Sequence, residues 1–581
     1  MEGFVKAFDN FKPPSNKGEN GHKQYTWAKQ EAPLFSKKEK QTFSYFEESI
    51  TQISFQLVRG SDVIKKYEEI MTSLKYHIET LECAEYSNYL VVLFKLCAHT
   101  RDIVNGKGEC KLSYEMLMVI NKLYPEVGGI LFKSFLMLEI DGASVHPYGS
   151  WKDIKKVAEM YRSQCTPQQL GTKLNFIIEL VNEQLAIDEK RLRNGEDVSL
   201  VGKWIPRESS AFGWLYLPLV LNYYASVLPE VLKPASISYY KMQYRKLLSK
   251  LNAKLDTTQV KQCGKVWATI DPNHVTSVTM FKNKKAFLNL NKKGNPRSTE
   301  LDREKCALHF ESFLDKATKG EATIKGKRIG LNDFTKEALA LNMSQHREIQ
   351  LLNLQWENNA TQNGALGNMI SLVDVSGSMS GDPLHAAIAL GIRVAEKSKL
   401  GKRIITFTEV PEWVNLEGID GFVNMVKKTK NASWGMTTSF HKALDLILTI
   451  IAQQKMPAEQ VKQLTLVIFS DMMIDAADKN YDSMYDMIKQ KYAETGQKVV
   501  GVPYQPPHIL FWNLRSTNGF PTLAKQKNTT MLSGFSPMLL NLFCEKGVEG
   551  LENYTPWSML LESLNHPRYN MLNDACARFI A

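Results

Sequence analysis

The chain contains 581 residues, of which 44% are hydrophobic and 23% are charged, and its formal net charge at pH 7 is +11. This length exceeds what one hydrophobic core organises, and the composition excludes wholesale disorder and a fibrous architecture. Residues 361–581 contain 21 Lys and Arg against 20 Asp and Glu, so nearly all the positive charge falls within residues 1–360. That imbalance slightly favours a polyanion, such as a nucleic acid, as the partner of residues 1–360.

Membrane insertion and secretion are not expected. The longest apolar run, from Phe212 to Tyr224, is aromatic-rich, contains a proline and falls short of the roughly 18 to 20 residues that span a bilayer. The amino terminus lacks the basic start and apolar core of a signal peptide. The eight cysteines are scattered without zinc-ligand spacing, which is typical of reduced thiols. We therefore expect an intracellular, cytoplasmic protein without membrane contact.

The first 360 residues divide into a leader and a helical region. Residues 1–44 are rich in Lys, Asn, Pro and Ser with little apolar periodicity, so we expect an irregular or flexible leader. From residue 45 to 360 apolar residues recur at three- and four-residue spacing, and Pro and Gly divide the region into many short helices. The pattern predicts an α-helical array of packed, HEAT-like pairs, although no sequence period marks a regular solenoid.

The pattern changes near residue 367. The apolar run from Met369 to Val375 predicts a short buried strand, and a turn and a helix over 383–399 are predicted after it. Further strands are expected at 403–407, 464–469 and 508–514, and further helices at 418–428, 440–453 and 481–495. This alternation predicts a mostly parallel, Rossmann-like sheet covered by helices over residues 361–581. The final helical stretch, 537–580, either closes this domain or docks onto the helical part.

The strongest motif is the run Asp374-Val375-Ser376-Gly377-Ser378 at the carboxyl end of the first strand, which is where ligands bind in open α/β sheets. One carboxylate and two hydroxyls on alternate residues of a tight turn can converge on a cation, and such hard oxygen donors suit Mg²⁺. Thr437-Thr438 and Ser470-Asp471 follow other parts of the sheet and reach the same edge. The alternative is that these Ser and Asp residues only cap helices.

Together these residues resemble the metal-ion-dependent adhesion site of von Willebrand factor A domains. The resemblance implies that Ser376, Ser378 and one threonine coordinate the ion directly, while Asp374 and Asp471 act mainly through water. We prefer Thr438 to Thr437 because the residues after it fit the start of a helix. In that family a partner's Asp or Glu carboxylate fills the open position of the ion, although several A-type domains keep the fold and lose the ion.

Catalytic motifs are lacking. Ser376 is not in a Gly-x-Ser-x-Gly elbow, because residue 374 is Asp. The nearest phosphate-loop pattern, from Gly195 to Lys203, has the wrong spacing and is followed by Trp204. We therefore expect a binding protein and no enzyme, and an enzyme of an unfamiliar type is the weakest alternative.

The helical region carries a second resemblance. Arg101-Asp102 is followed by Gly106-Lys107-Gly108-Glu109 and then by Tyr148-Gly149-Ser150-Trp151-Lys152-Asp153. These segments resemble the TROVE module of the Ro autoantigen family, in which a ring of helical repeats precedes an A-type domain. The closer match, over roughly residues 45–580, is to an uncharacterised relative family with the same order of parts, known from plants and large DNA viruses.

Ro-like proteins bind the ends of misfolded RNAs in a basic ring and structured small RNAs on its outer face, so the resemblance implies an RNA partner. Lys and Arg interleaved with Trp and Tyr can supply phosphate contacts and base stacking. The alternative is that these residues are solvated or form internal ion pairs. The candidate RNA-binding residues are Arg101, Lys107, Lys203, Arg207, Lys282, Lys284 and Lys285.

A scaffold function is the main alternative to RNA binding. In that case the metal site captures an acidic side chain of a protein partner, and the helical region supplies interaction surface without RNA. A Lys-, Asn- and Met-rich composition is compatible with a virus-encoded protein, including a structural component of a virion.

Overall fold

The computed structural model describes residues 15–17, 23–27, 38–81, 84–226, 234–407, 411–431, 440–472, 484–517, 519–546 and 551–580. The chain folds into two compact units, one formed by Met1–Val119 together with Thr323–Ala581 and the other by Ile120–Ala322. The expected combination of a helical array and a C-terminal sheet is present, and the sheet has six strands. The units are not divided near residue 360, because the first 119 residues belong with the sheet.

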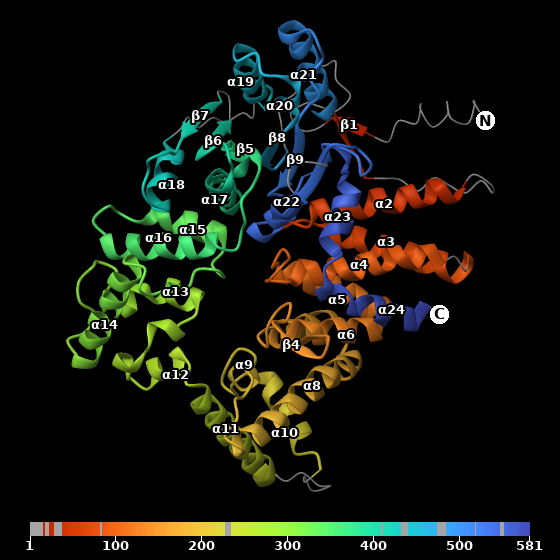
Figure 1. Ribbon diagram of the computed structural model, residues 1–581. Helices are drawn as coiled ribbons and strands as arrows, with labels where there is room; N and C mark the ends of the chain where they lie inside the picture. The colour runs from red at the N-terminus through yellow and green to blue at the C-terminus, as the bar shows by residue number, and fades with distance from the viewer. Residues whose placement is uncertain are drawn as a thin grey trace. The chain divides into compact units, whose positions relative to one another are not determined.

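The first unit is built on a six-stranded sheet with the strand order β10-β9-β8-β5-β6-β7 (Figure 1). Strand β7 runs antiparallel to β6, and the other neighbouring strands are parallel. The chain thus starts in the middle of the sheet at β5, moves outward to one edge and returns to build the other half. The strands are β5 (Asn368–Asp374), β6 (Arg403–Phe407), β7 (Glu412–Asn415), β8 (Leu464–Ser470), β9 (His508–Asn513) and β10 (Thr529–Ser533).

Helices cover both faces of this sheet, so its central strands are buried on both sides, as their continuous apolar runs predict. On one face Leu372 of β5 packs with Phe440 and Ile488, which come from α19 (Phe440–Gln453) and α21 (Met484–Val500). On the other face α17 (Asp382–Lys397) approaches β5 closely at Gly391, where an added Cβ would lie 2.4 Å from Val373 Cγ2. Only glycine permits this approach.

The remaining helices of the first unit come from three parts of the chain. Two short helices, α18 (Phe422–Lys430) and α20 (Ala458–Lys462), connect the strands, and α15 (Leu331–Ala340) and α16 (His346–Ala360) precede the sheet. The N-terminal helices α2 (Lys38–Gln56), α3 (Val63–Leu81) and α4 (Ala84–Arg101) pack with α23 (Pro556–Leu564) and α24 (Met571–Ile580). The last stretch of the chain, which also includes α22 (Asn541–Lys546), therefore docks onto the first helices.

Where the structure describes it, the second unit is mainly helical and contains a hairpin of β3 (Leu138–Ile140) and β4 (Ala143–Val145). Helix α5 (Cys110–Leu123) runs across the boundary into it. The longer helices are joined by short 3-10 turns at residues 213–215, 267–269 and 272–274. Its α-helices are α6 (Pro125–Leu136), α7 (Asp153–Gln164), α8 (Pro167–Arg193), α9 (Val201–Trp204), α10 (Tyr216–Tyr223), α11 (Pro234–Leu255), α12 (Thr258–Cys263), α13 (Ser277–Phe287) and α14 (Leu301–Thr318).

The segment expected to be an irregular leader contains regular structure where it is described. Strand β1 (Ser15–Lys17) pairs with β2 (Lys23–Tyr25), and the backbone of Tyr25 exchanges hydrogen bonds with Phe520 at 3.2 and 3.0 Å. Helix α2 begins at Lys38. In the part of the chain that the structure describes, no helix is both long and apolar enough to cross a bilayer.

Candidate metal site and basic surfaces

The candidate metal site lies where the order of strands reverses. Strands β5 and β8 are neighbours, yet the chain leaves β5 toward β6 on one side and reaches β8 only after completing that half of the sheet. Loops diverge from such a point and leave a crevice at the carboxyl ends of the two strands, which is the usual ligand position in open α/β sheets. Asp374 ends β5, Ser470 ends β8, and Asp471 directly follows β8.

Hydrogen bonds hold the Asp374 carboxylate against both loops. The Ser376 backbone N–H donates to Asp374 Oδ1 at 2.9 Å, and Ser470 Oγ donates to Asp374 Oδ2 at 2.6 Å. The Ser376 and Ser378 hydroxyl oxygens are 3.1 Å apart. Two serine hydroxyls therefore lie next to each other beside the carboxylate. Ser470 also contributes to the site through its hydrogen bond to Asp374. The sequence analysis placed Ser470 at this edge, and we did not include it among the candidate ligands.

The site combines two buried acids. Asp374 and Asp471 are both 0% exposed. Burial raises the pKa of Asp374 to about 7, and the negative charge of Asp471 adds to the increase, while hydrogen bonds from Ser376 and Ser470 oppose it. A buried pair of like charges is costly unless a proton or a cation is shared between them. Carboxylates with serine hydroxyls are the hard oxygen donors that Mg²⁺ takes, so the residues present fit a divalent ion.

The threonine of the expected ligand set cannot be placed, because Thr437 and Thr438 lie outside the described residues. Among the described residues, at this edge of the sheet as elsewhere, no three His, Cys, Asp or Glu side chains gather as a metal cage would require. The candidate site depends on serine hydroxyls as well as carboxylates, and it therefore differs from a cage built only from His, Cys, Asp and Glu side chains.

Arg515 also belongs to this edge, and the sequence analysis missed it. It follows β9, its side chain is exposed, and Nη1 donates to the Ser378 carbonyl oxygen. The Arg515 backbone is held by Asn513 Oδ1 at 3.1 Å. No local motif marks this residue, because its nearness to Ser378 depends on the order of the strands.

Two candidate RNA-binding residues are buried in the first unit. Lys107 is 6% exposed, and its ammonium donates to Ser54 O at 2.7 Å and to Ser533 Oγ at 2.6 Å. Burial lowers the pKa of Lys107 to about 7, with the nearby Glu109 carboxylate opposing the change. Arg101 is 3% exposed and lies over the Tyr114 ring. In this conformation neither residue offers its charge to a ligand at the surface.

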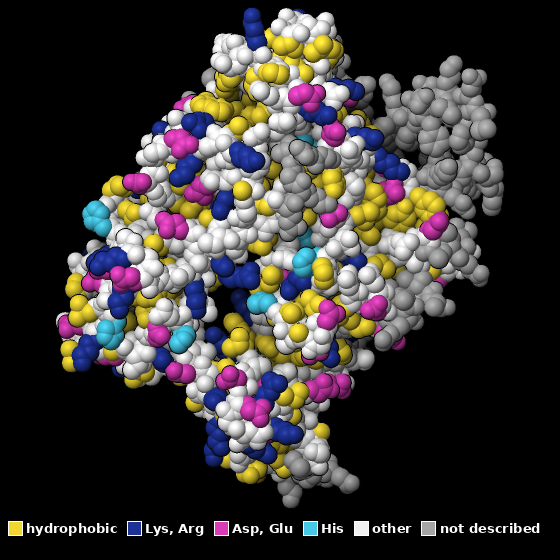
Figure 2. Space-filling view, in the orientation of Figure 1, with side chains coloured by type: hydrophobic (Ala, Val, Ile, Leu, Met, Phe, Trp, Pro, Cys, Tyr) yellow, Lys and Arg dark blue, Asp and Glu magenta, His cyan; other side chains and the backbone are white. Residues whose placement is uncertain are grey.

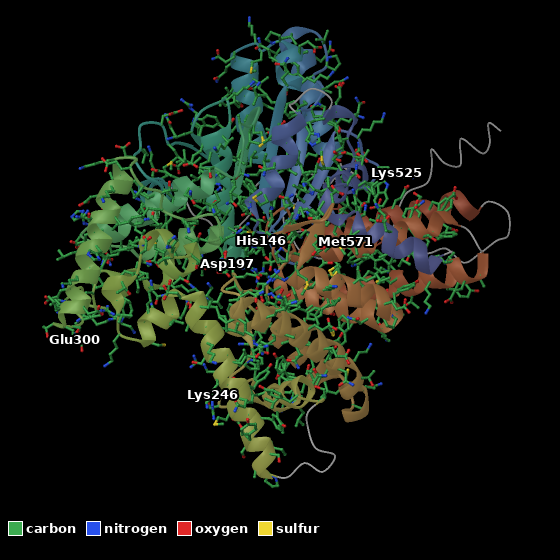
Figure 3. The ribbon with its side chains drawn as sticks, turned by 60° about the horizontal axis from the view of Figure 1, so that its bottom comes forward. His146, Asp197, Lys246, Glu300, Lys525 and Met571 are labelled. Atoms are coloured by element: carbon green, nitrogen blue, oxygen red, sulfur yellow. The ribbon has the colours of Figure 1, made fainter. Side chains whose placement is uncertain are left out.

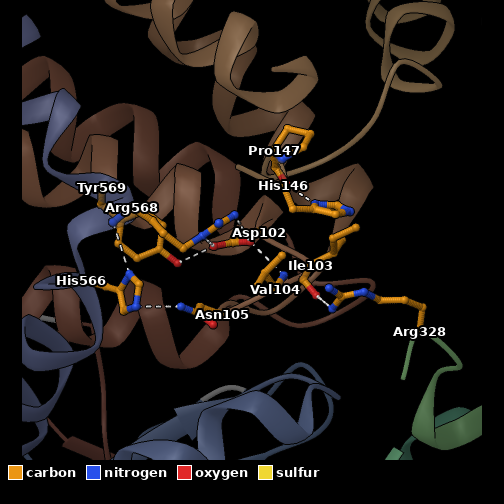
Figure 4. Close-up of polar contacts among 10 residues, drawn as sticks. All are labelled: Asp102, Ile103, Val104, Asn105, His146, Pro147, Arg328, His566, Arg568 and Tyr569. Atoms are coloured by element: carbon orange, nitrogen blue, oxygen red, sulfur yellow. Dashed lines mark hydrogen bonds and ion pairs between the residues drawn. The ribbon is translucent and has the colours of Figure 1, made fainter. Parts of the chain in front are cut away.

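The rest of the Arg-Asp and Gly-Lys-Gly-Glu motif also makes internal contacts. The Asp102 carboxylate accepts hydrogen bonds from Arg568 at 2.8 and 3.1 Å and from the Tyr569 hydroxyl at 3.1 Å (Figure 4). Glu109 accepts two hydrogen bonds from Arg59 Nε, each at 2.9 Å. The motif thus fastens the end of α4 to the α2–α3 loop and to the last helices of the chain.

Lys203 and Arg207 lie on a surface of the second unit where basic and aromatic side chains alternate. The Trp204 ring lies 5.4 Å from Lys155 Nζ and 5.7 Å from Lys203 Nζ. We call this the aromatic–basic surface, and it consists of Lys152, Lys155, Lys156, Arg162, Lys203, Trp204, Arg207, Phe212 and Trp214.

The charges of the aromatic–basic surface lie close to one another. Burial lowers the pKa of Lys155, and the like charges of Lys152 and Arg207 add to that decrease. Lys156 is exposed and lies 5.2 Å from the Phe212 ring, and Arg162 lies 4.8 Å from the Trp214 ring, with Glu159 4.0 Å away. The half-buried rings are held in place while the charged ends reach solvent.

The three remaining candidates lie on α13. Lys282 is exposed and Lys285 is half-buried. Lys284 is 8% exposed, lies 4.6 Å from the Phe281 ring and donates to the Phe281 carbonyl oxygen at 3.1 Å. The run therefore does not present three lysines to one ligand. In the view of Figure 2 basic side chains are scattered among acidic and hydrophobic ones.

Comparison with known proteins relates both units to one viral protein. Over 493 residues the chain is 30% identical to an uncharacterized protein of Acanthamoeba polyphaga mimivirus, and the match covers 81% of this chain and 79% of that protein. The chain belongs to the family of that protein. Residues 368–564 also match a family model described as a domain of unknown function, DUF7788. The DUF7788 match begins at the first residue of β5 and ends at the last of α23, so it contains the candidate metal site and Arg515.

Proposed function

We propose that the DUF7788 region is a von Willebrand factor A-type domain that holds a divalent cation, and that the protein acts by binding and not by catalysis. Three features support the proposal: the strand order, the antiparallel edge strand β7, and a site that joins the ends of β5 and β8. The ion would supply an open coordination position for an acidic group of a partner.

The observation that carries this proposal is the buried pair of Asp374 and Asp471 beside the hydroxyls of Ser376, Ser378 and Ser470. In a catalytic site of acyl transfer the serine would need a neighbouring base. The Ser376 hydroxyl lies 3.1 Å from the Ser378 hydroxyl, the Ser376 backbone N–H donates to Asp374, and both contacts arrange oxygens around one point. That arrangement is suited to holding an ion.

Isothermal titration of the full chain with Mg²⁺ tests the cation proposal. We expect one binding event per chain in the wild type and its loss in Asp374→Asn and in Asp471→Asn. Asp420→Asn, at an exposed position, serves as the matched control and should bind as the wild type does. Binding that persists unchanged in both site variants would overturn the proposal.

We further propose that the helical part binds single-stranded RNA in a TROVE-like manner, with the aromatic–basic surface as the contact. Exposed Lys152, Lys156 and Arg207 would contact phosphates, and the Trp204 and Trp214 rings would stack on bases. Base stacking tolerates any sequence, so the expected preference is for unpaired over duplex RNA.

Fluorescence anisotropy with a labelled oligouridine tests the RNA proposal. The triple variant Lys152→Glu, Lys156→Glu, Arg207→Glu should lose most of its affinity and bind with a shallower dependence on salt. Lys305 and Lys316 are exposed on α14, the helix that follows Glu300 in Figure 3, and Lys319 is exposed directly after it. Replacement of these three lysines by Glu is the matched control. Equal losses in the two triple variants would show only a general charge effect and would contradict the proposed contact.

The second candidate function is a scaffold that does not bind RNA, and the candidate metal site is the observation that favours it. A protein that binds Mg²⁺ at Asp374, ignores oligouridine and associates with a protein partner only in the absence of chelator would have that function. Because the chain belongs to the family of a mimivirus protein, such a scaffold would fit a structural component encoded by a virus.

A further inference from the structure

Arg515 lies at the rim of the candidate metal site. Its guanidinium donates to the carbonyl oxygen of Ser378, the residue whose hydroxyl lies 3.1 Å from that of Ser376. The loop that carries Arg515 is fixed at its base, because Asn513 accepts from the Arg515 backbone and donates to Phe55 O at 2.9 Å. The charge is therefore held in place by the fold, and its exposed face is open to an incoming group.

A second arginine, Arg59, lies near this edge and already pairs with acidic side chains. Arg59 is paired through two hydrogen bonds with Glu109 and lies 3.6 Å from Asp382, at the start of α17. Arg515, by contrast, pairs with no carboxylate among the residues that the structure describes, and its guanidinium donates to the neutral Ser378 carbonyl. An exposed guanidinium that donates to a neutral carbonyl next to a cation-type site is arranged to receive an anion.

We propose that Arg515 determines the ligand class of this site by donating to the same carboxylate that the bound cation receives, so that the site selects an acidic side chain of a protein segment. This inference rests on the proposed function of the metal site. One carboxylate oxygen fills the open position of the ion, and the second accepts from the Arg515 guanidinium.

The balance of charge favours a carboxylate over a phosphate monoester. When ionised, Asp374 and Asp471 carry two negative charges and offset a divalent ion. Arg515 then supplies the remaining positive charge at the rim, because Arg59 faces two carboxylates, Glu109 and Asp382, and that group adds no positive charge. A singly charged carboxylate matches that remaining charge, and its two oxygens match the fork of a guanidinium.

The proposal is tested by measuring water-proton relaxation of the full chain loaded with Mn²⁺, using acetate as the probe. Acetate displaces water from the bound ion and lowers the relaxation enhancement. We expect Arg515→Ala to bind Mn²⁺ as the wild type does and to bind acetate about ten-fold more weakly, the effect of losing one charge-assisted hydrogen bond. The acetate affinity of Arg515→Lys should lie between those of the wild type and Arg515→Ala, because lysine keeps the positive charge and loses the paired donors of the guanidinium.

Arg403→Ala is the matched control. Arg403 lies at the amino end of β6, also donates to a backbone carbonyl and pairs with Glu417, so its replacement should leave both affinities unchanged. Equal acetate affinity in the wild type and Arg515→Ala would overturn the inference and leave the metal site standing. A loss of Mn²⁺ affinity in Arg515→Ala would assign Arg515 a structural role and likewise overturn it. Tighter binding of inorganic phosphate than of acetate would overturn the carboxylate class, and a wild type that binds no Mn²⁺ would overturn both proposals.

Discussion

Asp102 and Arg568 form a buried, two-point ion pair although they lie 466 residues apart in the sequence. Arg568 Nε and Nη2 each donate to a different oxygen of the carboxylate, and Tyr569 adds a third hydrogen bond. This contact joins α4 to the end of the chain within the unit that carries the sheet. The first helices and the last are therefore parts of one folding unit.

Removing one member of this pair should strongly destabilise the first unit. Arg568→Ala leaves the Asp102 charge buried without its partner, and breaking such a pair typically costs about 3–5 kcal/mol. We expect a correspondingly lower urea midpoint for the transition of this unit. Lys65→Ala removes an exposed pair with Asp62 and should change the stability by no more than about 1 kcal/mol. A midpoint for Arg568→Ala equal to that control would contradict the role of the pair.

Lys107 should give the protein a dependence of stability on pH. Its pKa is about 7 in the fold, against an ordinary value of 10.5, so between these values the unfolded chain binds a proton that the folded chain does not. The free energy of unfolding then rises with pH through this window, by up to about 1.4 kcal/mol per pH unit.

The variant Lys107→Met should lose that rise, and Lys111→Met, at an exposed position, should keep it. Urea unfolding at several pH values between about 7 and 10 measures the slope for each protein. Parallel curves for the wild type and Lys107→Met would show that the buried ammonium does not titrate in this range.

The packing of α17 on β5 should depend on Gly391. The Cβ of Gly391→Ala would lie 2.4 Å from Val373 Cγ2, so strand and helix must separate, at a cost of about 1–3 kcal/mol. Combining Gly391→Ala with Val373→Ala removes the clashing methyl group and should recover part of the loss. If the double variant is as unstable as the sum of the two single variants, the contact is not the cause.

Magnesium should stabilise the sheet-containing unit. An ion that binds only the folded state stabilises it by about 2.7 kcal/mol at a hundred-fold excess over its dissociation constant. The thermal midpoint of the wild type should therefore rise with Mg²⁺ and fall with EDTA. The thermal midpoint of Asp471→Asn should change with neither Mg²⁺ nor EDTA. A change equal to that of the wild type would show that the stabilising ion binds elsewhere.

The sequence predicted the central strands well, because β5, β8 and β9 are short apolar runs buried on both faces. Strands β7 and β10 were missed. They are edge strands, where one side is unpaired and polar residues such as Glu412 and Thr529 are tolerated, so their apolar signal is weak.

The candidate metal residues could be proposed from the sequence because strand ends meet at one edge of a parallel sheet, which is a local consequence of the βα pattern. The burial of Arg101 and Lys107 could not be found in this way. It results from the first 119 residues folding onto the sheet, and Lys107 contacts Ser533, 426 residues away. Arg515 was missed for the same reason, since the order of the strands brings it to Ser378.

The most direct test of the central claim is anomalous diffraction from crystals of the protein soaked in Mn²⁺. We expect one strong anomalous peak at the crevice bounded by Asp374, Ser376, Ser378 and Asp471. A peak at this position would show that the ends of β5 and β8 form a cation site. A wild-type crystal with no peak there, or with its peak elsewhere, would contradict the account of this domain as a cation-dependent binding module.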